Sequence, residues 1–231
     1  MKKIDRQIAG SHPPGWIVAC CLLLLSGCSE VPATVVTVIQ PQSPQIAFTA
    51  ERLKVMSLNI AHGRKDGINQ LFLSGATIRK NLDEIAAVLD HSGADIVALQ
   101  EADAPSLWSG NFDHIALLAE QADYPAVVHT AHARSWLFNY GTAILSQADF
   151  IETLNYTFEP SPPTLTKGFT LAQSVWQPHG QEQPPVLLDI VSVHLDFSRR
   201  EVRENQIREI TQVLEGRDNP LIILGDFNSD W

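Results

Sequence analysis

The alternation of apolar and polar positions becomes regular near residue 53. Residues 53–60, LKVMSLNI, alternate as a half-buried strand does. Residues 78–93 carry apolar side chains at helical spacing and end at a glycine, which predicts a helix. Residues 94–101, ADIVALQE, are nearly all apolar, as in a strand covered on both faces. A strand, a helix and a strand in this order favour an α/β fold.

The same kinds of pattern continue to the end of the chain. Helices are predicted at residues 112–122 and 199–214, and Asn219-Pro220 ends the second region. Further strands are predicted at 124–132, 141–146, 148–158, 168–178, 184–197 and 221–224. This succession predicts a single α/β domain over residues 51–231.

The N-terminus has a different character. Lys2, Lys3 and Arg6 precede a ten-residue apolar run at 16–25, which is too short to span a bilayer. We interpret residues 1–27 as a secretory signal, with an ordinary buried segment as the alternative.

The stretch LSGC at residues 25–28 resembles the lipobox of bacterial lipoproteins. The resemblance implies cleavage before Cys28 and lipidation of that cysteine; a simpler signal peptide with a chance cysteine is the alternative. Ser29 follows the cysteine, which implies sorting to the outer membrane. We therefore expect a lipid-anchored protein of the bacterial cell envelope that faces the periplasm.

The segment behind the predicted anchor is short of charge. Residues 28–50 are rich in Pro, Thr, Gln and Ser, and we interpret them as the lipidated cysteine and a flexible tether. A short strand within TVVTVI, residues 34–39, is the alternative. The three cysteines are Cys20, Cys21 and Cys28, so the mature domain would contain no free thiol, disulfide or thiolate metal site.

The charge balance bears on the partner. The chain has a net charge of −10, and residues 1–27 hold three cations and one anion, so the mature chain would carry −12. Binding to a nucleic-acid backbone rests largely on neutralising phosphates with a basic face. The balance disfavours tight duplex binding.

Four predicted strands end in a polar residue that can do chemistry. These residues are Asn59, Glu101, His194 and Asp226, the last accompanied by Asn228. Each alone is a weak signal, because an Asn after a strand is usually a turn former and GDFN fits an Asx turn equally well. Functional groups gather at one end of the strands in α/β sheets, so the ordered set is stronger than its members.

Five segments in order resemble the endonuclease/exonuclease/phosphatase superfamily: VMSLNI, DIVALQE, YGTAILS, VSVHLDF and ILGDFN. The superfamily includes deoxyribonucleases, abasic-site endonucleases, neutral sphingomyelinases and inositol phosphate phosphatases. The resemblance covers residues 53–231. It implies a four-layer α/β sandwich, with two central mixed β-sheets flanked by helices. It also implies metal-dependent hydrolysis of phosphodiester or phosphomonoester bonds, with Mg²⁺ or Mn²⁺ as the cofactor.

The resemblance assigns roles to the strand-end residues. Glu101 corresponds to the metal-binding Glu, and Asn59 would steady the metal or a phosphate oxygen. Asp226 would orient or deprotonate the attacking water and share a second metal. His194 would donate to a phosphoryl oxygen, or act as a general acid if charged. Asn228 would donate its amide N–H to the phosphate.

Other residues are weaker candidates. His62 and Arg64 follow Asn59 within reach of a phosphate, and a solvated loop is the alternative. Ala61 stands where some relatives carry a carboxylate, so His62 could replace part of that ligand's role. Tyr140 is a candidate for the substrate rim or a packed aromatic before a turn. Asp196 could orient the His194 imidazole or cap the turn into the next helix.

The family pattern continues past GDFN, through further strands to an Asp and a terminal Ser-Asp-His element, whereas this sequence ends at Trp231. We therefore expect the domain to be incomplete at its C-terminus and to lack its last strands. The expected consequences are partial folding and negligible phosphodiesterase turnover.

We expect a monomer that acts on a phosphate ester, with small or lipid phosphodiesters favoured over DNA. The first alternative is a non-catalytic, truncated lipoprotein that binds phosphate-containing ligands. The second is a periplasmic α/β binding protein with chance motifs, which would require the four strand ends to lie apart.

Overall fold

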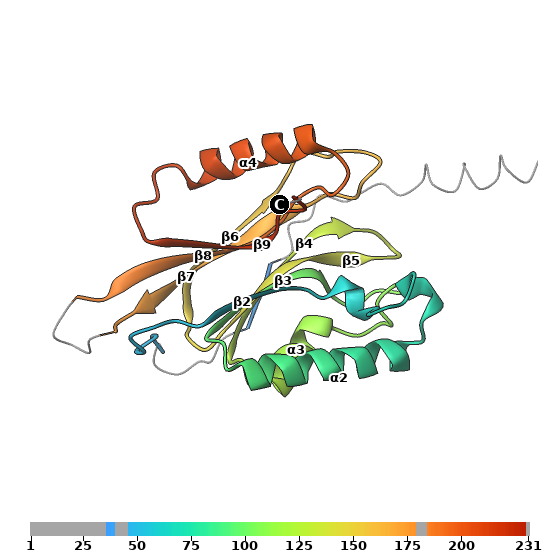
Figure 1. Cartoon of the computed structure of the whole chain (residues 1–231), viewed down its shortest axis with the longest axis horizontal. Helices are drawn as coiled ribbons and strands as arrows, with labels where there is room; N and C mark the ends of the chain where they lie inside the picture. The colour runs from blue at the N-terminus through green and yellow to red at the C-terminus, as the bar shows by residue number, and fades with distance from the viewer. Residues whose placement is uncertain (1–35, 40–45, 179–183, 230–231) are drawn as a thin grey trace, which may run out of the picture.

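The computed structural model describes residues 36–39, 46–178 and 184–229. Two β-sheets lie face to face, helices α2 and α3 cover the outer face of one, and helix α4 covers the outer face of the other (Figure 1). This arrangement is the predicted four-layer α/β sandwich. The predicted signal segment 1–27 and Cys28 lie outside the described residues.

Both sheets are mixed. The first has the strand order β1-β4-β5-β3-β2 and the second β6-β7-β8-β9. In each sheet one outer pair is parallel, β2 with β3 and β8 with β9, and every other pair is antiparallel. The first sheet contains β1 (Val36–Ile39), β2 (Val55–Asn59), β3 (Ile96–Asp103), β4 (Ala126–Arg134) and β5 (Asn139–Ser146). The second contains β6 (Phe150–Thr157), β7 (Gly168–Trp176), β8 (Val186–His194) and β9 (Leu221–Asp226).

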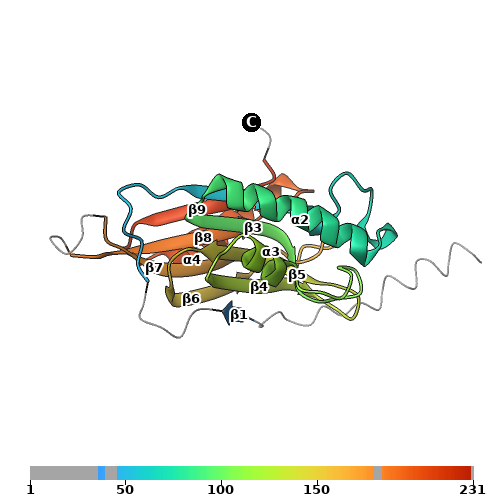
Figure 2. The same ribbon diagram turned by 90° about the horizontal axis from the view of Figure 1, so that it is seen from below.

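Each parallel pair is joined by a helix, because parallel strands need a crossover connection. Helix α2 (Gly75–Ser92) links β2 to β3, and helix α4 (Arg200–Leu214) links β8 to β9. In Figure 2, which is rotated by 90° from Figure 1, strands β8 and β9 of the second sheet are seen next to β3 and α2. The two β-α-β units place the carboxyl ends of four strands at the same end of the sandwich.

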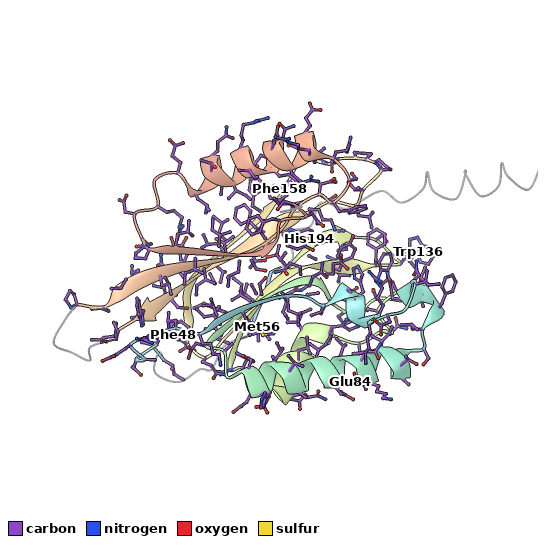
Figure 3. The ribbon with its side chains drawn as sticks, in the orientation of Figure 1. Phe48, Met56, Glu84, Trp136, Phe158 and His194 are labelled. Carbon is purple, nitrogen blue, oxygen red and sulfur yellow. The ribbon has the colours of Figure 1, made fainter. Side chains whose placement is uncertain are left out.

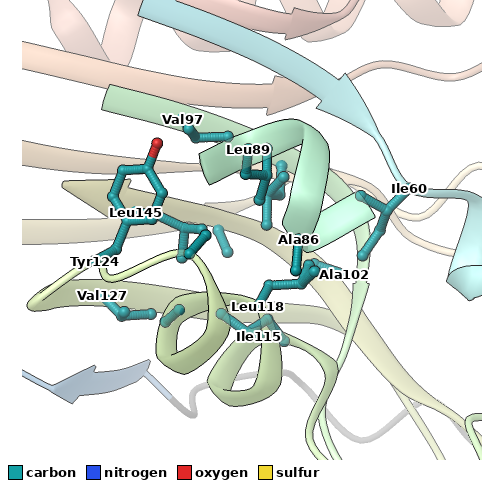
Figure 4. Close-up of a cluster of buried hydrophobic side chains, with 14 of the residues drawn as sticks. Ile60, Ala86, Leu89, Val97, Ala102, Ile115, Leu118, Tyr124, Val127 and Leu145 are labelled. Carbon is teal, nitrogen blue, oxygen red and sulfur yellow. The ribbon is translucent and has the colours of Figure 1, made fainter. Parts of the chain in front are cut away.

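Local sequence explains the ends of helix α2. The Ser74 hydroxyl accepts the Thr77 backbone N–H at the start, and Gly93 closes the helix in the left-handed region with φ 57°. The helix buries Ile78, Leu82 and Leu89 against the first sheet. They belong to an apolar cluster with α3 (His114–Gln121) and Tyr124, shown in Figure 4.

The contact between the two sheets changes character along the strands. Far from the strand ends discussed below, Ile96, Ile144 and Ile190 pack across the interface with Phe48. Nearer those ends the interface is polar: the Thr142 and Thr170 hydroxyls lie 2.8 Å apart, and the Gln100 amide donates to the Ser192 hydroxyl. Buried polar groups are tolerated only when paired, and these pairs satisfy that condition.

Part of the stretch predicted as a flexible tether belongs to the folded domain. Residues 36–39 form β1 and pair with β4, which is the short strand that the alternative interpretation predicts. Phe48 is 5% exposed, and its backbone N–H donates to the Val175 carbonyl. The tether prediction failed here because low charge and scattered prolines do not reveal pairing with a distant strand edge. Among the described residues, no helix has the length and apolar character needed to cross a bilayer.

Candidate active site

The four predicted strand ends meet between the two sheets. The Asn59 side-chain amide donates to Asp226 Oδ2 at 2.9 Å. His194 Nε2 lies 3.9 Å from Glu101 Oε1 and 3.9 Å from Asp226 Oδ2. The structure therefore brings together Asn59, Glu101, His194 and Asp226, whereas the chance-motif interpretation requires them to lie apart.

Glu101 reaches the site through a β-bulge. The register of β3 against β5 shifts between Gln100 and Ala102, and Glu101 adopts a φ of 51°, in the left-handed region. A non-glycine residue pays about 1–3 kcal/mol for such a conformation, and such residues concentrate at functional sites. Gly141 lies opposite the bulge, where a Cβ atom would stand 1.9 Å from the Thr130 carbonyl oxygen. Only glycine lets the strands approach closely enough at this point.

His194 is buried beneath the two carboxylates. Its Nδ1 lies 3.4 Å from Lys167 Nζ, and its Nε2 is directed towards Glu101 and Asp226. Burial, with the Lys167 charge, holds the pKa of His194 well below its ordinary value. Its imidazole is therefore neutral at pH 7 and suited to donating a hydrogen bond, which disfavours the predicted alternative of a charged general acid.

Lys167 is a site residue that the sequence analysis missed. It is 6% exposed and precedes Gly168, the residue paired with His194 across β7 and β8. Burial lowers the pKa of Lys167, although the charges of Glu101, Asp196 and Asp226 oppose the shift. The sequence carries no local signal for Lys167, because the pairing of Gly168 with His194 is set by long-range register.

His62 is 7% exposed, so it does not lie in the solvated loop of the alternative interpretation. Its Nδ1 lies 2.8 Å from Asp103 Oδ2, and its Nε2 lies 3.3 Å from Glu101 Oε2. The rings of Trp108 and Tyr140 meet its ring edge-on at 5.1 and 4.7 Å. His62 is therefore wedged behind Glu101. Burial is the main cause that lowers its pKa to about 4.

The other candidates also have partners within the protein. Tyr140 is 4% exposed among aromatic rings, which is the packed-aromatic alternative and places it away from a substrate rim. Arg64 donates to the Gly67 carbonyl at 3.1 Å, so its guanidinium is directed to backbone. The Asn228 amide donates to the Leu195 carbonyl, and its backbone N–H donates to Asp226 Oδ1 as in an Asx turn. The hydrogen bonds of Arg64 and Asn228 to the protein thus use donors that the prediction assigns to phosphate.

Asp196 caps the turn into α4, as the second of its two interpretations predicts. Its Oδ1 accepts the backbone N–H groups of Ser198 and Arg199 at 2.8 and 3.0 Å. Burial alone would raise the pKa of Asp196, but hydrogen bonds from Thr164 and Ser198 lower it to about 2. Asp196 is thus a fixed anion on the Lys167 side of the site.

The donor chemistry of the site suits a hard divalent cation. Within the described part of the chain, no three His, Cys, Asp or Glu side chains are arranged as a metal cluster. Mg²⁺, however, is usually held by one or two carboxylates and keeps several waters. Glu101 and Asp226 offer such carboxylates, with side chains 19% and 30% exposed. The Asn59 oxygen accepts the Ala61 N–H and its amide donates to Asp226, so Asn59 orients Asp226 and would reach a metal only through the second lone pair of that oxygen.

Comparison with known proteins gives a consistent picture. The model of the endonuclease/exonuclease/phosphatase family matches residues 56–231. No curated protein matches the chain. Among solved structures, an endonuclease/exonuclease/phosphatase family protein from Leptotrichia buccalis is similar, with a TM-score of 0.54 and 17% identity over 78% of this chain and 67% of that one.

Two TDP2 structures are also similar. Humanized TDP2 from D. rerio gives a TM-score of 0.51 at 19% identity, over 78% of this chain and 64% of that one. TDP2 from C. elegans gives 0.50 at 18% identity, over 77% of this chain and 48% of that one. The chain thus spans between about half and two thirds of these structures, and at such identities the similarity establishes the fold alone.

Proposed function

Because the chain belongs to the endonuclease/exonuclease/phosphatase family, we propose that it is a phosphoesterase that uses Mg²⁺ or Mn²⁺ to hydrolyse phosphate esters. The observation that carries the proposal is the meeting of Glu101, His194 and Asp226 at the carboxyl ends of two parallel strand pairs. Two carboxylates can hold a divalent ion, and a neutral imidazole and a buried ammonium can stabilise the charge on a transferring phosphoryl group.

Each residue has a role that its geometry supports. Lys167 and the Nε2–H of His194 would donate to phosphoryl oxygens and stabilise the charge that develops there. Asp226, oriented by Asn59, would accept a proton from water as the water oxygen attacks phosphorus and the ester oxygen leaves. A divalent ion held by Glu101 would supply further neutralisation of the phosphoryl oxygens.

The proposal extends to substrate and location. The net charge of −12 expected for the mature chain favours small or lipid phosphodiesters over DNA. Lipid anchoring through Cys28 would hold the protein, as a monomer, in the bacterial cell envelope.

Calorimetry tests the proposal most directly. We expect inorganic phosphate to bind in the presence of Mg²⁺ and binding to be lost in Glu101→Ala. Glu120→Ala, at an exposed position on α3, serves as the control and should bind like the parent. Absence of Mg²⁺-dependent phosphate binding in the parent chain would refute the proposed site.

Turnover is measured separately with bis-p-nitrophenyl phosphate and Mg²⁺. Hydrolysis that Glu101→Ala abolishes would establish catalysis by this chain. Mg²⁺-dependent binding without hydrolysis would instead favour the non-catalytic, phosphate-binding alternative.

A further inference from the structure

Large apolar side chains are exposed on three loops around the mouth of the site. Ile68 is 95% exposed, Phe72 83%, Trp136 76%, Leu107 56% and Leu71 49%. We call these five residues the apolar rim. The loops that carry them follow the carboxyl ends of β2 and β3 and join β4 to β5.

The three loops adjoin one another. The Trp108 backbone N–H donates to the Leu137 carbonyl at 3.0 Å, which joins the loop of Leu107 to the hairpin of Trp136. Gly75, which follows the loop of Phe72, packs on Gly110, where an added Cβ would lie 3.4 Å from the Gly110 oxygen. Figure 3 shows Trp136 at the outer margin of the molecule, with His194 in the interior between the sheets. The rim therefore lies on the first sheet's side of one end of the sandwich, the end at which the site lies.

The direction of β1 relates this end to the predicted anchor. β1 is antiparallel to β4, with Val36 opposite Thr130 and Ile39 opposite Val127, so the chain enters β1 from the side of the Trp136 hairpin. Thr130 lies four residues before Arg134, roughly 13 Å along the strand. Cys28 precedes Val36 by eight residues, which can span at most roughly 28 Å. The chain between Cys28 and β1 is thus long enough for a lipid on Cys28 to lie beyond the Trp136 hairpin, on the rim side, while the chain keeps the direction of β1.

We propose that the apolar rim enters a lipid bilayer and presents the mouth of the site to the lipid headgroups. Separate side chains at loop tips suit insertion among acyl chains, whereas a protein partner is usually met by a continuous patch. The rim includes a tryptophan, which is favoured at the membrane interface. Arg134, exposed at the end of β4 beside the Trp136 hairpin, can face anionic headgroups.

The membrane contact does not depend on the proposed phosphoesterase activity. Its consequence for the substrate, a phosphate ester in a lipid headgroup, rests on the proposed function. The two are separable because membrane insertion is measured without turnover or metal.

The experiment uses the full chain, produced as a lipoprotein and reconstituted in phosphatidylethanolamine–phosphatidylglycerol vesicles whose acyl chains are brominated. Intact mass establishes the lipid on Cys28. We expect brominated lipid to quench tryptophan fluorescence, and Trp136→Phe to remove the quenched component. The double variant Ile68→Ser/Phe72→Ser should lower the inserted population by about tenfold or more, because burial of a single large apolar side chain is already worth about that factor.

The matched control is Ile151→Ser/Leu187→Ser. These residues are 41% and 40% exposed and lie near the starts of β6 and β8, at the end of the second sheet away from His194. Brominated lipid should quench the tryptophan fluorescence of the control as strongly as that of the parent. Any one of four results would overturn the proposal. These results are no quenching in the parent, quenching of the rim variant equal to that of the parent, an equal loss of quenching in the control, and an unmodified Cys28. Light scattering in detergent, which measures molar mass, gives another possible refutation. If the parent is a dimer and the rim variant a monomer, the rim is a contact between copies of the chain.

Discussion

Gly141→Ala is expected to damage both stability and the site. Gly141 lies on β5 opposite two register irregularities, one in β3 at Glu101 and one in β4 between Ala131 and Ala133. A Cβ at this position would meet the Thr130 oxygen at 1.9 Å and the His132 nitrogen at 2.9 Å. Both atoms are backbone, so no side-chain rotation relieves the overlap.

The size of the effect follows from this overlap. To reach a tolerable separation of about 3 Å from the Thr130 oxygen, the strands must move apart by about 1 Å. Overpacking of a well-packed core typically costs 1–3 kcal/mol, and a clash with backbone places this change near the upper end, at about 3 kcal/mol. For a domain of this size the midpoint of thermal unfolding would fall by roughly 6–12 °C. Mg²⁺ binding is expected to weaken as well, because β5, which must move away from β4, also pairs with β3 beside Glu101.

Thermal unfolding followed by circular dichroism measures the first effect, and calorimetric titration with Mg²⁺ the second. Gly75→Ala is the matched control, since a Cβ there meets its nearest atom at 3.4 Å at the start of a helix. The control should change the free energy of unfolding by no more than about 1 kcal/mol. A Gly141→Ala variant as stable as the control, with unchanged Mg²⁺ affinity, would show that the bulge does not depend on this glycine.

Three further changes test other parts of the structure. His62→Ala should weaken Mg²⁺ binding by about 10-fold or more, because His62 supports Glu101, the proposed metal ligand; His62→Gln, which retains an N–H donor, should restore most of the affinity measured by calorimetry. Lys167→Met should weaken phosphate binding in the same assay and leave Mg²⁺ affinity nearly unchanged; a parallel loss of both would contradict its proposed role. Arg217→Met should cost about 3–5 kcal/mol in urea denaturation, because the fully buried Asp189 loses its cation; a cost below 1 kcal/mol would refute this.

The Asp189 carboxylate also predicts a pH dependence. Burial alone would raise the pKa of Asp189, but hydrogen bonds from Arg217, Gln173 and Asn219 hold it below its ordinary value. The unfolded state therefore binds a proton more readily than the folded state. The stabilisation is complete above the ordinary pKa of about 3.9 and is lost as the pH falls through the lower folded pKa. In Arg217→Met, urea denaturation at a series of pH values should show a smaller loss of stability in this acid range than in the parent.

Much of the fold could be predicted because its elements carry local signals. The apolar spacing of residues 78–93 gives α2, and its capping residue and closing glycine are also local. The site could be predicted in outline for a related reason: in both parallel pairs the strands point the same way, so residues at their carboxyl ends meet. Asn59, Glu101, His194 and Asp226 were found by that rule.

Lys167, which sequence reasoning missed, and the buried position of His62 depend on backbone features that no local sequence pattern marks. Lys167 enters the site because Gly168 pairs with His194, and no pattern near Lys167 shows this pairing. His62 is buried because Ala61 and His62 both adopt positive φ, 48° and 56°, and turn the chain back over the end of β3. Neither residue is a glycine, so the usual sequence marker of that conformation was absent.

The bulge explains why Glu101 is available for chemistry at all. Along β3, Val97 and Leu99 pack in the cluster beneath α2 and α3, whereas Ile96 and Gln100 face the second sheet. Strict alternation would therefore send Glu101 into the apolar cluster, where an unpaired carboxylate is costly. The extra residue of the bulge gives that place to Ala102, which belongs to the cluster, and turns Glu101 towards His194. The strand segment LQE and the segment YG on β5 thus meet at one point, since Gly141 pairs with Ala102 beside the bulge of β3 and closely approaches Thr130 of β4.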